Sequence, residues 1–558
     1  MFSLSSSSIN TLFHENRITE RTPSATSCSF YKPHFQAVAQ SSKSVNKLGA
    51  LPSSSQTVAV HHNPSIIETE NNTKKVDPKF VLTGNFAPVD EMPPTQCLVI
   101  QGELPQSLNG AYIRNGPNPQ HQPLGPHHLF EGDGMLHSIR LSGGQAIFCS
   151  RYVKTYKYNL ERKAGVPLIP NFLSGFYGLT DLFRGTIIIL ARAINGQINL
   201  AEGFGVANTS LAFFFDSLFA MVETDLPYAI RVTQEGDIET IGRYNFAGQV
   251  FANMTAHPKI DAKTGELFAF RCFPVFPYLT FFRFDTNGLK EQDVPIFSMK
   301  GPTYVHDFAI TERYAVFPDT QLEMDTMNML TCKGMPLRSQ SAKMPRIGII
   351  PRCATSDSEM RWFEVPGFNG FHIINVWEEE DDSIIIIAPN VLISENLFQS
   401  MDKLHFSLEK LRIDMKTGMA SRTILSKTSL ELGSINAAYA GKKNRFAYMA
   451  MGEHIPKMSG VVKIDLELEC EVSKRTYEDG CFGGEAFFVA RDAGDPDCDE
   501  DDGYVVSYVH NEITKESRFV VMDAKSPTLE IVAAVKLPGR VPYGFHGLFV
   551  SENDLKKL

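Results

Sequence analysis

The stretch Ile260-Asp261-Ala262-Lys263-Thr264-Gly265 returns in nearly the same form as Ile413-Asp414-Met415-Lys416-Thr417-Gly418. A third copy at residues 284–288 keeps the apolar residue, the Asp and the Gly, and weaker copies occur at 464–465 and 522–525. Each copy separates two runs that read as short strands, so each predicts a tight turn. The uneven steps between copies indicate insertions in a repeated unit. The pattern predicts an all-β-dominated fold, and it favours a β-propeller with elaborated blades over a sandwich.

Composition limits the functions that this chain can have. The chain has 558 residues and a net charge of −10, and no long basic run offsets that charge, which argues against nucleic-acid binding. Nine cysteines are scattered without paired spacing, which is typical of a reducing compartment. No apolar run approaches the roughly 18 residues needed to span a bilayer. Forty Phe against two Trp suit either ordinary core packing or a long apolar tunnel.

The N-terminal region differs in composition from the rest of the chain. Residues 1–50 are rich in Ser, and Glu15 and Glu20 are the only acidic residues before Glu68. A Ser-rich, acid-poor segment without a continuous apolar run is typical of an organelle transit peptide and not of a secretory signal. A disordered tail without targeting function is the alternative. We expect a flexible linker at 51–76 and a folded domain at 77–558.

The segment Phe371-His372-Ile373-Ile374-Asn375-Val376-Trp377 places a histidine inside an apolar run. In strand alternation His372, Ile374 and Val376 share one face, which predicts an imidazole that points inward. Such a ring needs partners for both nitrogens, and a metal ion together with a hydrogen-bond acceptor would supply them. A core histidine bonded to backbone carbonyls is the competing interpretation for a single residue.

Three further histidines have similar surroundings. His257, His306 and His546 each lie alone among apolar or small residues, far from one another along the chain. No H-x-H, HExxH or CxxC motif is present, so spacing alone does not assemble them. A propeller would explain such spacing, because strands that line its axis come from different blades.

These four histidine segments resemble the iron-ligand segments of the carotenoid cleavage dioxygenases. Supporting segments occur in the same order, at residues 114–119 (Arg-Asn-Gly-Pro-Asn-Pro), 128–137 and 483–489. The likeness runs from about residue 77 to the end of the chain. It implies a seven-bladed β-propeller with a helical and loop dome over the active-site end, so that residues 77–558 would form a carotenoid oxygenase domain.

The resemblance also implies the chemistry. It predicts one Fe²⁺ per chain, bound by the catalytic residues His257, His306, His372 and His546. Both atoms of dioxygen would be inserted across one double bond of a carotenoid or apocarotenoid, giving two carbonyl products. An uncompensated divalent charge in a dry axis would be costly, so carboxylates that accept from the imidazoles are expected. The family pattern places these at Glu223, Glu431 and Glu485, and it places Thr209 near a vacant coordination position.

The leader and the segment 438–444 resemble a plastid, plastoglobule-associated subgroup of the family. A 9-cis-epoxycarotenoid dioxygenase of abscisic acid synthesis is the nearest alternative. A non-catalytic carotenoid-binding scaffold is a third interpretation, of a different class.

Four other features have two readings each. Apolar residues at near-helical spacing in 160–189 suggest either a peripheral membrane or plastoglobule contact or a dome helix. The patch 211–222 is expected in the core or tunnel wall, and the acidic run 492–502 in a solvated loop and not at a metal. His127, His128 and His137 flank a turn signal, so turn and strand packing is preferred there to a second metal site.

Overall fold

The computed structural model describes residues 77–169, 173, 199–331, 335–394, 401–452, 455–495 and 497–558. The expected transit peptide (1–50) and linker (51–76) lie outside these residues, and so does most of the apolar segment 160–189.

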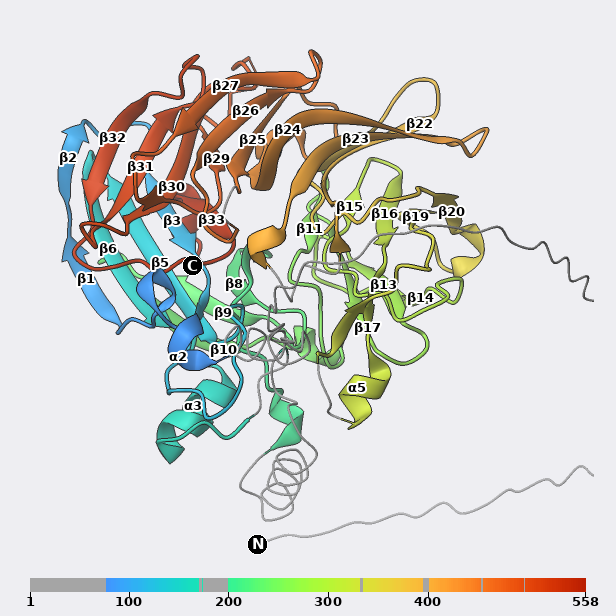
Figure 1. The fold of residues 1–558 in the computed structure, drawn as a ribbon, viewed down its shortest axis with the longest axis horizontal. Helices are drawn as coiled ribbons and strands as arrows, with labels where there is room; N and C mark the ends of the chain where they lie inside the picture. The colour runs from blue at the N-terminus through green and yellow to red at the C-terminus, as the bar shows by residue number, and fades with distance from the viewer. Residues whose placement is uncertain are drawn as a thin grey trace, which may run out of the picture. The chain divides into compact units, whose positions relative to one another are not determined.

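The described strands form seven antiparallel blades, which we number in chain order (Figure 1). Blade 1 contains β33 (Gly547–Ser551), β3 (Gly110–Arg114), β5 (Asp133–Ser142), β6 (Gln145–Tyr152) and β1 (Met92–Gln96), with the short β4 (Pro117–Asn118) beside β5. Blade 2 contains β7 (Ser210–Phe214), β8 (Ser217–Met221), β9 (Tyr228–Val232) and β10 (Ile238–Arg243). Blade 3 contains β11 (Lys259–Ile260), β12 (Leu267–Cys272), β13 (Leu279–Phe284) and β14 (Val294–Pro295).

Blade 4 contains β15 (Ala309–Ile310), β16 (Tyr314–Asp319), β19 (Arg346–Pro351) and β20 (Arg361–Glu364), and the hairpin of β17 (Leu322–Met324) and β18 (Leu337–Ser339) is inserted in it. Blades 5 and 6 share one long strand, β24 (Ala420–Ser434). Its first part completes blade 5 with β21 (Asn375–Glu378), β22 (Ser383–Val391) and β23 (Phe406–Asp414). Its last part begins blade 6, before β25 (Phe446–Met451), β26 (Gly460–Asp465) and β27 (Cys470–Thr476).

Strands from both ends of the domain close the ring. Blade 7 contains β28 (Cys481–Phe482), β29 (Phe487–Ala490), β30 (Gly503–Asn511), β31 (Ser517–Asp523) and β32 (Ile531–Lys536). Its outer edge is β2 (Leu98–Gly102), which pairs with β32, whereas the C-terminal β33 pairs with β3 of blade 1. Figure 1 shows the blue β2 beside the red β32 at this closure. The expectation of an all-β-dominated, seven-bladed propeller is confirmed.

The repeated Asp-turn-Gly motif has a common local structure. In the β11–β12 turn, Oδ1 of Asp261 accepts from the amides of Lys263 (2.8 Å) and Thr264 (3.1 Å). In the β23–β24 turn, Asp414 accepts in the same way from the second and third residues after it. The Gly that ends each of these turns has φ of +73° or +77°, a conformation that costs residues other than glycine free energy. The motif therefore marks where one strand of a blade reverses into the next.

The core lies between blades and inside them, because both faces of most strands are covered. All nine residues of β22 are buried. β7 and β8 are also largely buried, which confirms that the patch 211–222 belongs to the core and the cavity wall. Ala207, Leu218 and Ile230 of blade 2 pack in one hydrophobic cluster with Ile113 and Leu136 of blade 1.

The described helices are short and lie in the connections; Figure 1 shows α2, α3 and α5 below the sheets. They are α2 (Pro78–Val81), α3 (Tyr156–Ala164), α5 (Thr326–Thr331), α6 (Glu552–Leu555) and the 3-10 turns η1 (Gly84–Phe86), η2 (Leu200–Glu202), η3 (Phe246–Gly248), η4 (Asp357–Glu359), η6 (Met401–Lys403) and η7 (Ala437–Tyr439). Among the described residues, no helix is long and apolar enough to cross a bilayer. The seven cysteines described there are free thiols.

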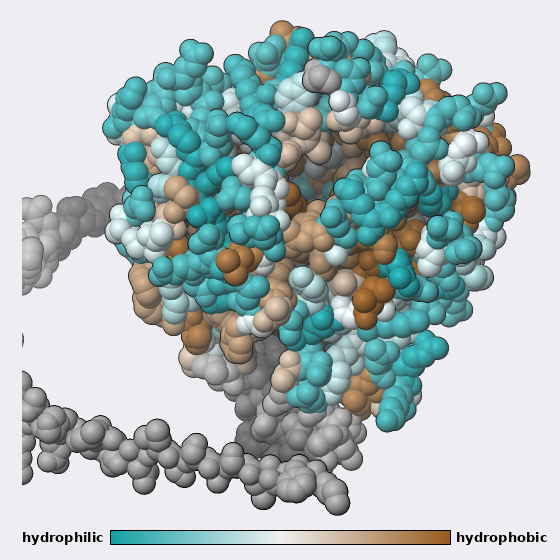
Figure 2. Space-filling model, turned by 180° about the vertical axis from the view of Figure 1, so that it is seen from behind, coloured by the Kyte–Doolittle hydropathy of each residue, from teal (hydrophilic) through white to brown (hydrophobic). Residues whose placement is uncertain are grey.

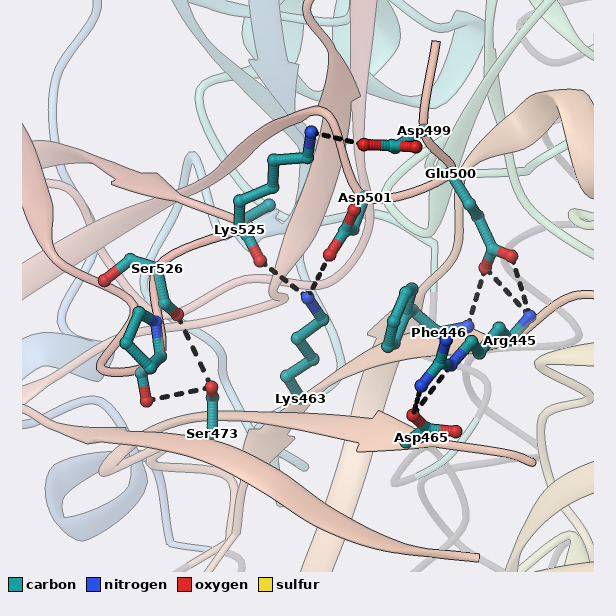
Figure 3. Close-up of polar contacts among 12 residues, drawn as sticks. Arg445, Phe446, Lys463, Asp465, Ser473, Asp499, Glu500, Asp501, Lys525 and Ser526 are labelled. Atoms are coloured by element: carbon teal, nitrogen blue, oxygen red, sulfur yellow. Dashed lines mark hydrogen bonds and ion pairs between the residues drawn. The ribbon is translucent and has the colours of Figure 1, made fainter. Parts of the chain in front are cut away.

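The acidic loop before β30 fastens blade 7 to blade 6 (Figure 3). The Glu500 carboxylate accepts from the amides of Arg445 (2.8 Å) and Phe446 (2.6 Å), which begin β25. The Asp501 carboxylate lies 2.6 Å from Nζ of Lys463, whose side chain is 6% exposed. Glu500 and Asp501 are therefore only partly exposed within the expected solvated loop, because their carboxylates bind groups of blade 6.

The contacts of Glu500 with blade 6 should contribute to the stability of the fold. Glu500→Ala leaves two amides of blade 6 without their acceptor and should lower the free energy of unfolding by about 1–3 kcal/mol. Asp497→Ala, in the same loop but at an exposed position, should change it by no more than about 0.5 kcal/mol. Urea unfolding of both variants measures the difference, and equal stability of the two would contradict a stabilising role for the Glu500 contacts.

Candidate metal centre

Four imidazoles meet at the axis of the propeller. One ring nitrogen from each of His257, His306, His372 and His546 lies within 4.8 Å of the corresponding atom of every other. Nε2 of His306 is 3.0 Å from Nε2 of His257 and 3.2 Å from Nε2 of His372. Two ligands at right angles on one metal, each with a bond of about 2.1 Å, would be about 3.0 Å apart. The nitrogens of His257, His306 and His372 thus have neighbour distances that fit ligands of one metal ion, and that of His546 lies in the same group.

Each histidine lies just ahead of the strand at the axial edge of its blade. His257 precedes β11, His306 precedes β15, and His546 precedes β33. His372 precedes β21, so the expectation that it lies within a strand is wrong. The reason is a long-range contact: the amide of Ile373 donates to a carboxylate oxygen of Asp307 (2.9 Å) and not to a neighbouring strand.

Three glutamates contact three of the four imidazoles on the side away from the cluster. Nδ1 of His372 lies 2.9 Å from Oε1 of Glu431, and Nδ1 of His546 lies 2.9 Å from Oε1 of Glu485. Nδ1 of His306 lies 2.6 Å from Oε1 of Glu223. A carboxylate at Nδ1 places the ring proton there, so Nε2 keeps its lone pair and faces the cluster.

Burial and charge act in opposite directions on these pairs. Burial alone would raise the pKa of Glu431, but the charge and hydrogen bond of His372 outweigh it and hold that pKa below its ordinary value. The same balance with His306 lowers the pKa of Glu223. For His257, burial and then the neighbouring imidazoles hold the pKa well below 6.5. Ionised carboxylates and a neutral imidazole are the forms that favour cation binding.

A break in β24 directs Glu431 to the axis. The register with β25 shifts between Glu431 and Ser434, and Leu432 between them adopts φ of +46°, which is uncommon for a residue with a Cβ. The Leu432 amide donates to the Glu431 carboxylate. The structure thus places Glu431, which the resemblance predicts as an imidazole acceptor, against His372.

Thr209 and two aromatic residues also lie near the cluster, and of these only Thr209 was expected from the sequence. Thr209, the expected neighbour of an open coordination position, lies just ahead of β7 in blade 2, and its carbonyl accepts from the His546 amide (3.4 Å). The ring of Phe371 stacks on His306 with centroids 4.0 Å apart, and the ring of Tyr304 lies 6.1 Å from that of His306. An aromatic residue next to a histidine is too common a pair to predict such stacking.

One large cavity opens onto the histidines. It has a volume of about 1040 Å³, and His306, His372, His546, Thr209 and Glu431 form part of its wall. Most of the remaining wall is apolar: Phe130, Ile169, Leu173, Phe204, Val206, Val222, Leu226, Val250, Phe251, Tyr304, Phe371, Leu404, Phe406, Ile455, Met458 and Phe545. Figure 2 shows hydrophobic residues gathered near the middle and the lower part of one face, within a mostly hydrophilic rim.

The other candidate residues join no metal group. Within the described ranges, the four axial histidines form the only cluster of His, Cys, Asp or Glu with metal-ligand spacing. His127 and His128 lie in the connection before β5, and His137 lies within β5. This arrangement agrees with the preferred packing interpretation for these three residues.

The described propeller and its axial histidines define a class of protein: a β-propeller built around a candidate four-histidine metal centre. The family model described as "Retinal pigment epithelial membrane protein" matches residues 86–551. A protein of Arabidopsis thaliana, named "Probable carotenoid cleavage dioxygenase 4, chloroplastic", is 57% identical over 87% of this chain and 82% of its own length. The chain belongs to this family, that of the carotenoid cleavage dioxygenases.

Two further comparisons agree with this assignment. A chloroplastic 9-cis-epoxycarotenoid dioxygenase of Oryza sativa subsp. japonica is 54% identical over 86% of this chain and 77% of its own length. Among solved structures, a mutant of the Synechocystis apocarotenoid oxygenase has a TM-score of 0.72 at 24% identity, and covers 86% of this chain and 99% of its own. At that identity the structural likeness concerns the fold.

The buried His137 gives a prediction about pH. Burial, with the charge of Arg114 adding to it, holds the pKa of His137 well below its ordinary value. Below about pH 6.5 His137 is protonated in the unfolded chain but stays neutral in the folded chain. As the pH falls, this difference lowers the free energy of unfolding by up to about 1.4 kcal/mol per pH unit. His137→Phe should therefore lose less thermal stability than the wild type between pH 7 and pH 5. An unchanged loss in melting temperature would contradict the inference.

Proposed function

We propose that this chain is a plastid non-haem iron dioxygenase that cleaves one double bond of a carotenoid or apocarotenoid. The observation that carries the proposal is that a large, mostly apolar cavity opens onto His306, His372 and His546, three of the four clustered imidazoles. His257, His306, His372 and His546 would hold the ferrous ion, with Glu223, Glu431 and Glu485 as acceptors behind three of them. The bound iron would supply the binding and activation of dioxygen.

The protein's own contribution is to position the substrate and to exclude water. A polyene offers only apolar surface along its length, so the apolar wall can hold it by burial, without polar contacts. The double bond that lies over the histidines is then set by where the cavity ends, which makes the choice of bond a matter of positioning. Phe371 and Tyr304 present their rings beside His306 and can stabilise positive charge that develops on the polyene.

Location in a plastid is supported by the names of the two relatives, both of which are described as chloroplastic. We propose that the Ser-rich residues 1–50 act as the transit peptide and that residues 51–76 link it to the propeller. The nearest alternative activity is that of a 9-cis-epoxycarotenoid dioxygenase, since one such enzyme is 54% identical to this chain. A carotenoid-binding scaffold without activity is less well supported, because all four histidines and all three glutamates are in place.

The membrane contact that the sequence suggested at 160–189 extends beyond the described residues, so we base it on the cavity mouth. Phe251 lines the cavity and is 77% exposed, so it lies at the mouth of the cavity. An apolar substrate that leaves a lipid phase would enter the cavity there. Phe251→Asp should reduce co-flotation of the full chain with liposomes of plastid galactolipids. Leu289→Asp is the control, because Leu289 is 62% exposed in the turn between β13 and β14. Equal flotation of both variants would remove the support for this contact.

The assay for the proposed activity uses the full chain loaded anaerobically with Fe²⁺. Wild-type protein should hold about one iron and convert at least one of β-carotene, zeaxanthin, an apocarotenal or 9′-cis-neoxanthin in detergent micelles. Fragment masses name the bond, and xanthoxin from neoxanthin would select the alternative activity. His306→Ala should lose iron and activity, whereas His405→Ala, at an exposed position, should keep both. A folded wild type that holds no iron would contradict the metal centre, and iron without product from any polyene would favour the scaffold.

A further inference from the structure

A fourth buried carboxylate, that of Asp307, belongs to the chain segments that carry the candidate metal ligands. Asp307 follows His306 directly, and the residue is 3% exposed. Its Oδ1 lies 2.7 Å from Nζ of Lys259 and accepts from the amide of Phe308 (2.8 Å). Its Oδ2 accepts from the amide of Ile373 (2.9 Å). One carboxylate thus bonds to groups on three chain segments.

The positions of these partners relate the carboxylate to the candidate ligands. Lys259 lies two residues after His257, in blade 3, and Ile373 lies one residue after His372, in blade 5. Asp307 itself lies one residue after His306, in blade 4. The same side chain therefore joins the segments that carry three of the four histidines.

Bonds from one carboxylate to three segments can fix the distances between histidines that lie on separate sheets. Blades 3, 4 and 5 are three separate sheets, so the strand ladders within them do not set their mutual distances. Yet the Nε2 atoms of the three histidines must stay 3.0 and 3.2 Å apart to share one ion. Hydrogen bonds to a buried carboxylate are directional and strong, and they act within one or two residues of the ligands.

We propose that Asp307 is a positioning residue that fixes His257, His306 and His372 relative to one another, so that the metal is bound by a preformed set of nitrogens. The inference rests on the proposed function, since it takes these histidines as metal ligands. Asp307 itself contacts neither metal nor substrate. Removal of the Asp307 carboxylate would weaken metal binding by displacing the histidines, which is the usual effect of removing a group that orients metal ligands.

Binding of Co²⁺ to the full apo-chain tests the proposal, because it reads the ligand geometry without requiring turnover. Asp307→Ala should weaken Co²⁺ binding by about 10–100-fold and change the d–d absorption of the bound ion. Asp307→Asn keeps the size of the side chain and an oxygen for the Ile373 amide, but its neutral head no longer pairs with Lys259. It should bind Co²⁺ with intermediate affinity, and it provides the test if the alanine variant does not fold.

Asp465 provides a matched control in blade 6. It is 1% exposed, it accepts from the amides of Glu467 and Leu468 (both 3.0 Å), and it pairs with Arg445 at 2.8 Å, as Figure 3 shows for the arginine. Asp465→Ala therefore removes a similar number of bonds far from the histidines in the chain. It should lower the melting temperature of the apo-protein but leave Co²⁺ affinity within about two-fold, since it alters no ligand segment.

The outcomes separate this inference from the proposed function. If wild-type protein binds Co²⁺ and Asp307→Ala binds it within two-fold of wild type, with an unchanged spectrum, the positioning role is wrong and the metal centre stands. Equal weakening by Asp307→Ala and Asp465→Ala would also overturn it, because it would indicate a general loss of stability. If folded wild type binds no Co²⁺, the metal centre itself fails.

Discussion

The structure depends on holding four imidazole nitrogens within 4.8 Å of one another when each comes from a different blade. Side-chain and backbone hydrogen bonds cross every blade boundary at this level. The His546 amide donates to the Thr209 carbonyl between blades 1 and 2, and the Ser210 hydroxyl donates to the Ala256 carbonyl between blades 2 and 3. Asp307 of blade 4 binds Lys259 of blade 3 and the Ile373 amide of blade 5, and His372 of blade 5 binds Glu431 of blade 6. The Ser434 hydroxyl donates to the Ala486 carbonyl between blades 6 and 7, and the Gly547 amide donates to Glu485 between blades 1 and 7. This axial belt of hydrogen bonds makes the propeller suitable for the site, because it joins the seven blades to one another around the four histidines.

The belt also explains how charge can be tolerated in the interior. Three glutamates would place three negative charges around a divalent cation, and each carboxylate lies against an imidazole. Burial of these carboxylates would be costly without such partners. The neighbouring imidazoles and amides lower the pKa of Glu223 and Glu431 instead. A site that is prepared in this way requires little rearrangement when it takes up its ion, because the counter-charges are already oriented.

The sequence predicted the elements of this site better than their connections. The Asp-turn-Gly motif predicts hairpins because Asp261 and Asp414 satisfy turn amides within their own segment, which is local chemistry. The four histidines and three glutamates were predicted from the family motifs that surround them. Asp307 was missed, since its partners Lys259 and Ile373 lie 48 and 66 positions away, and only the fold brings them together. His372 was predicted to lie in a strand because apolar and polar residues alternate around it. The bond from the Ile373 amide to Asp307 interrupts that strand, and nothing in the neighbouring sequence indicates it.

The separation between frame and wall has a consequence for specificity. The belt is made of groups that bind one another, so a change there alters ligand geometry for every substrate. The cavity wall is made of apolar side chains such as Val250, Leu404 and Ile455, which can change size without breaking a hydrogen bond. Relatives at 54–57% identity bear names that differ in substrate, and such differences are easiest to build in the wall. Substitutions that move the cleaved bond should therefore lie along the cavity, where the position of the polyene is set, and not among the residues that hold the four histidines.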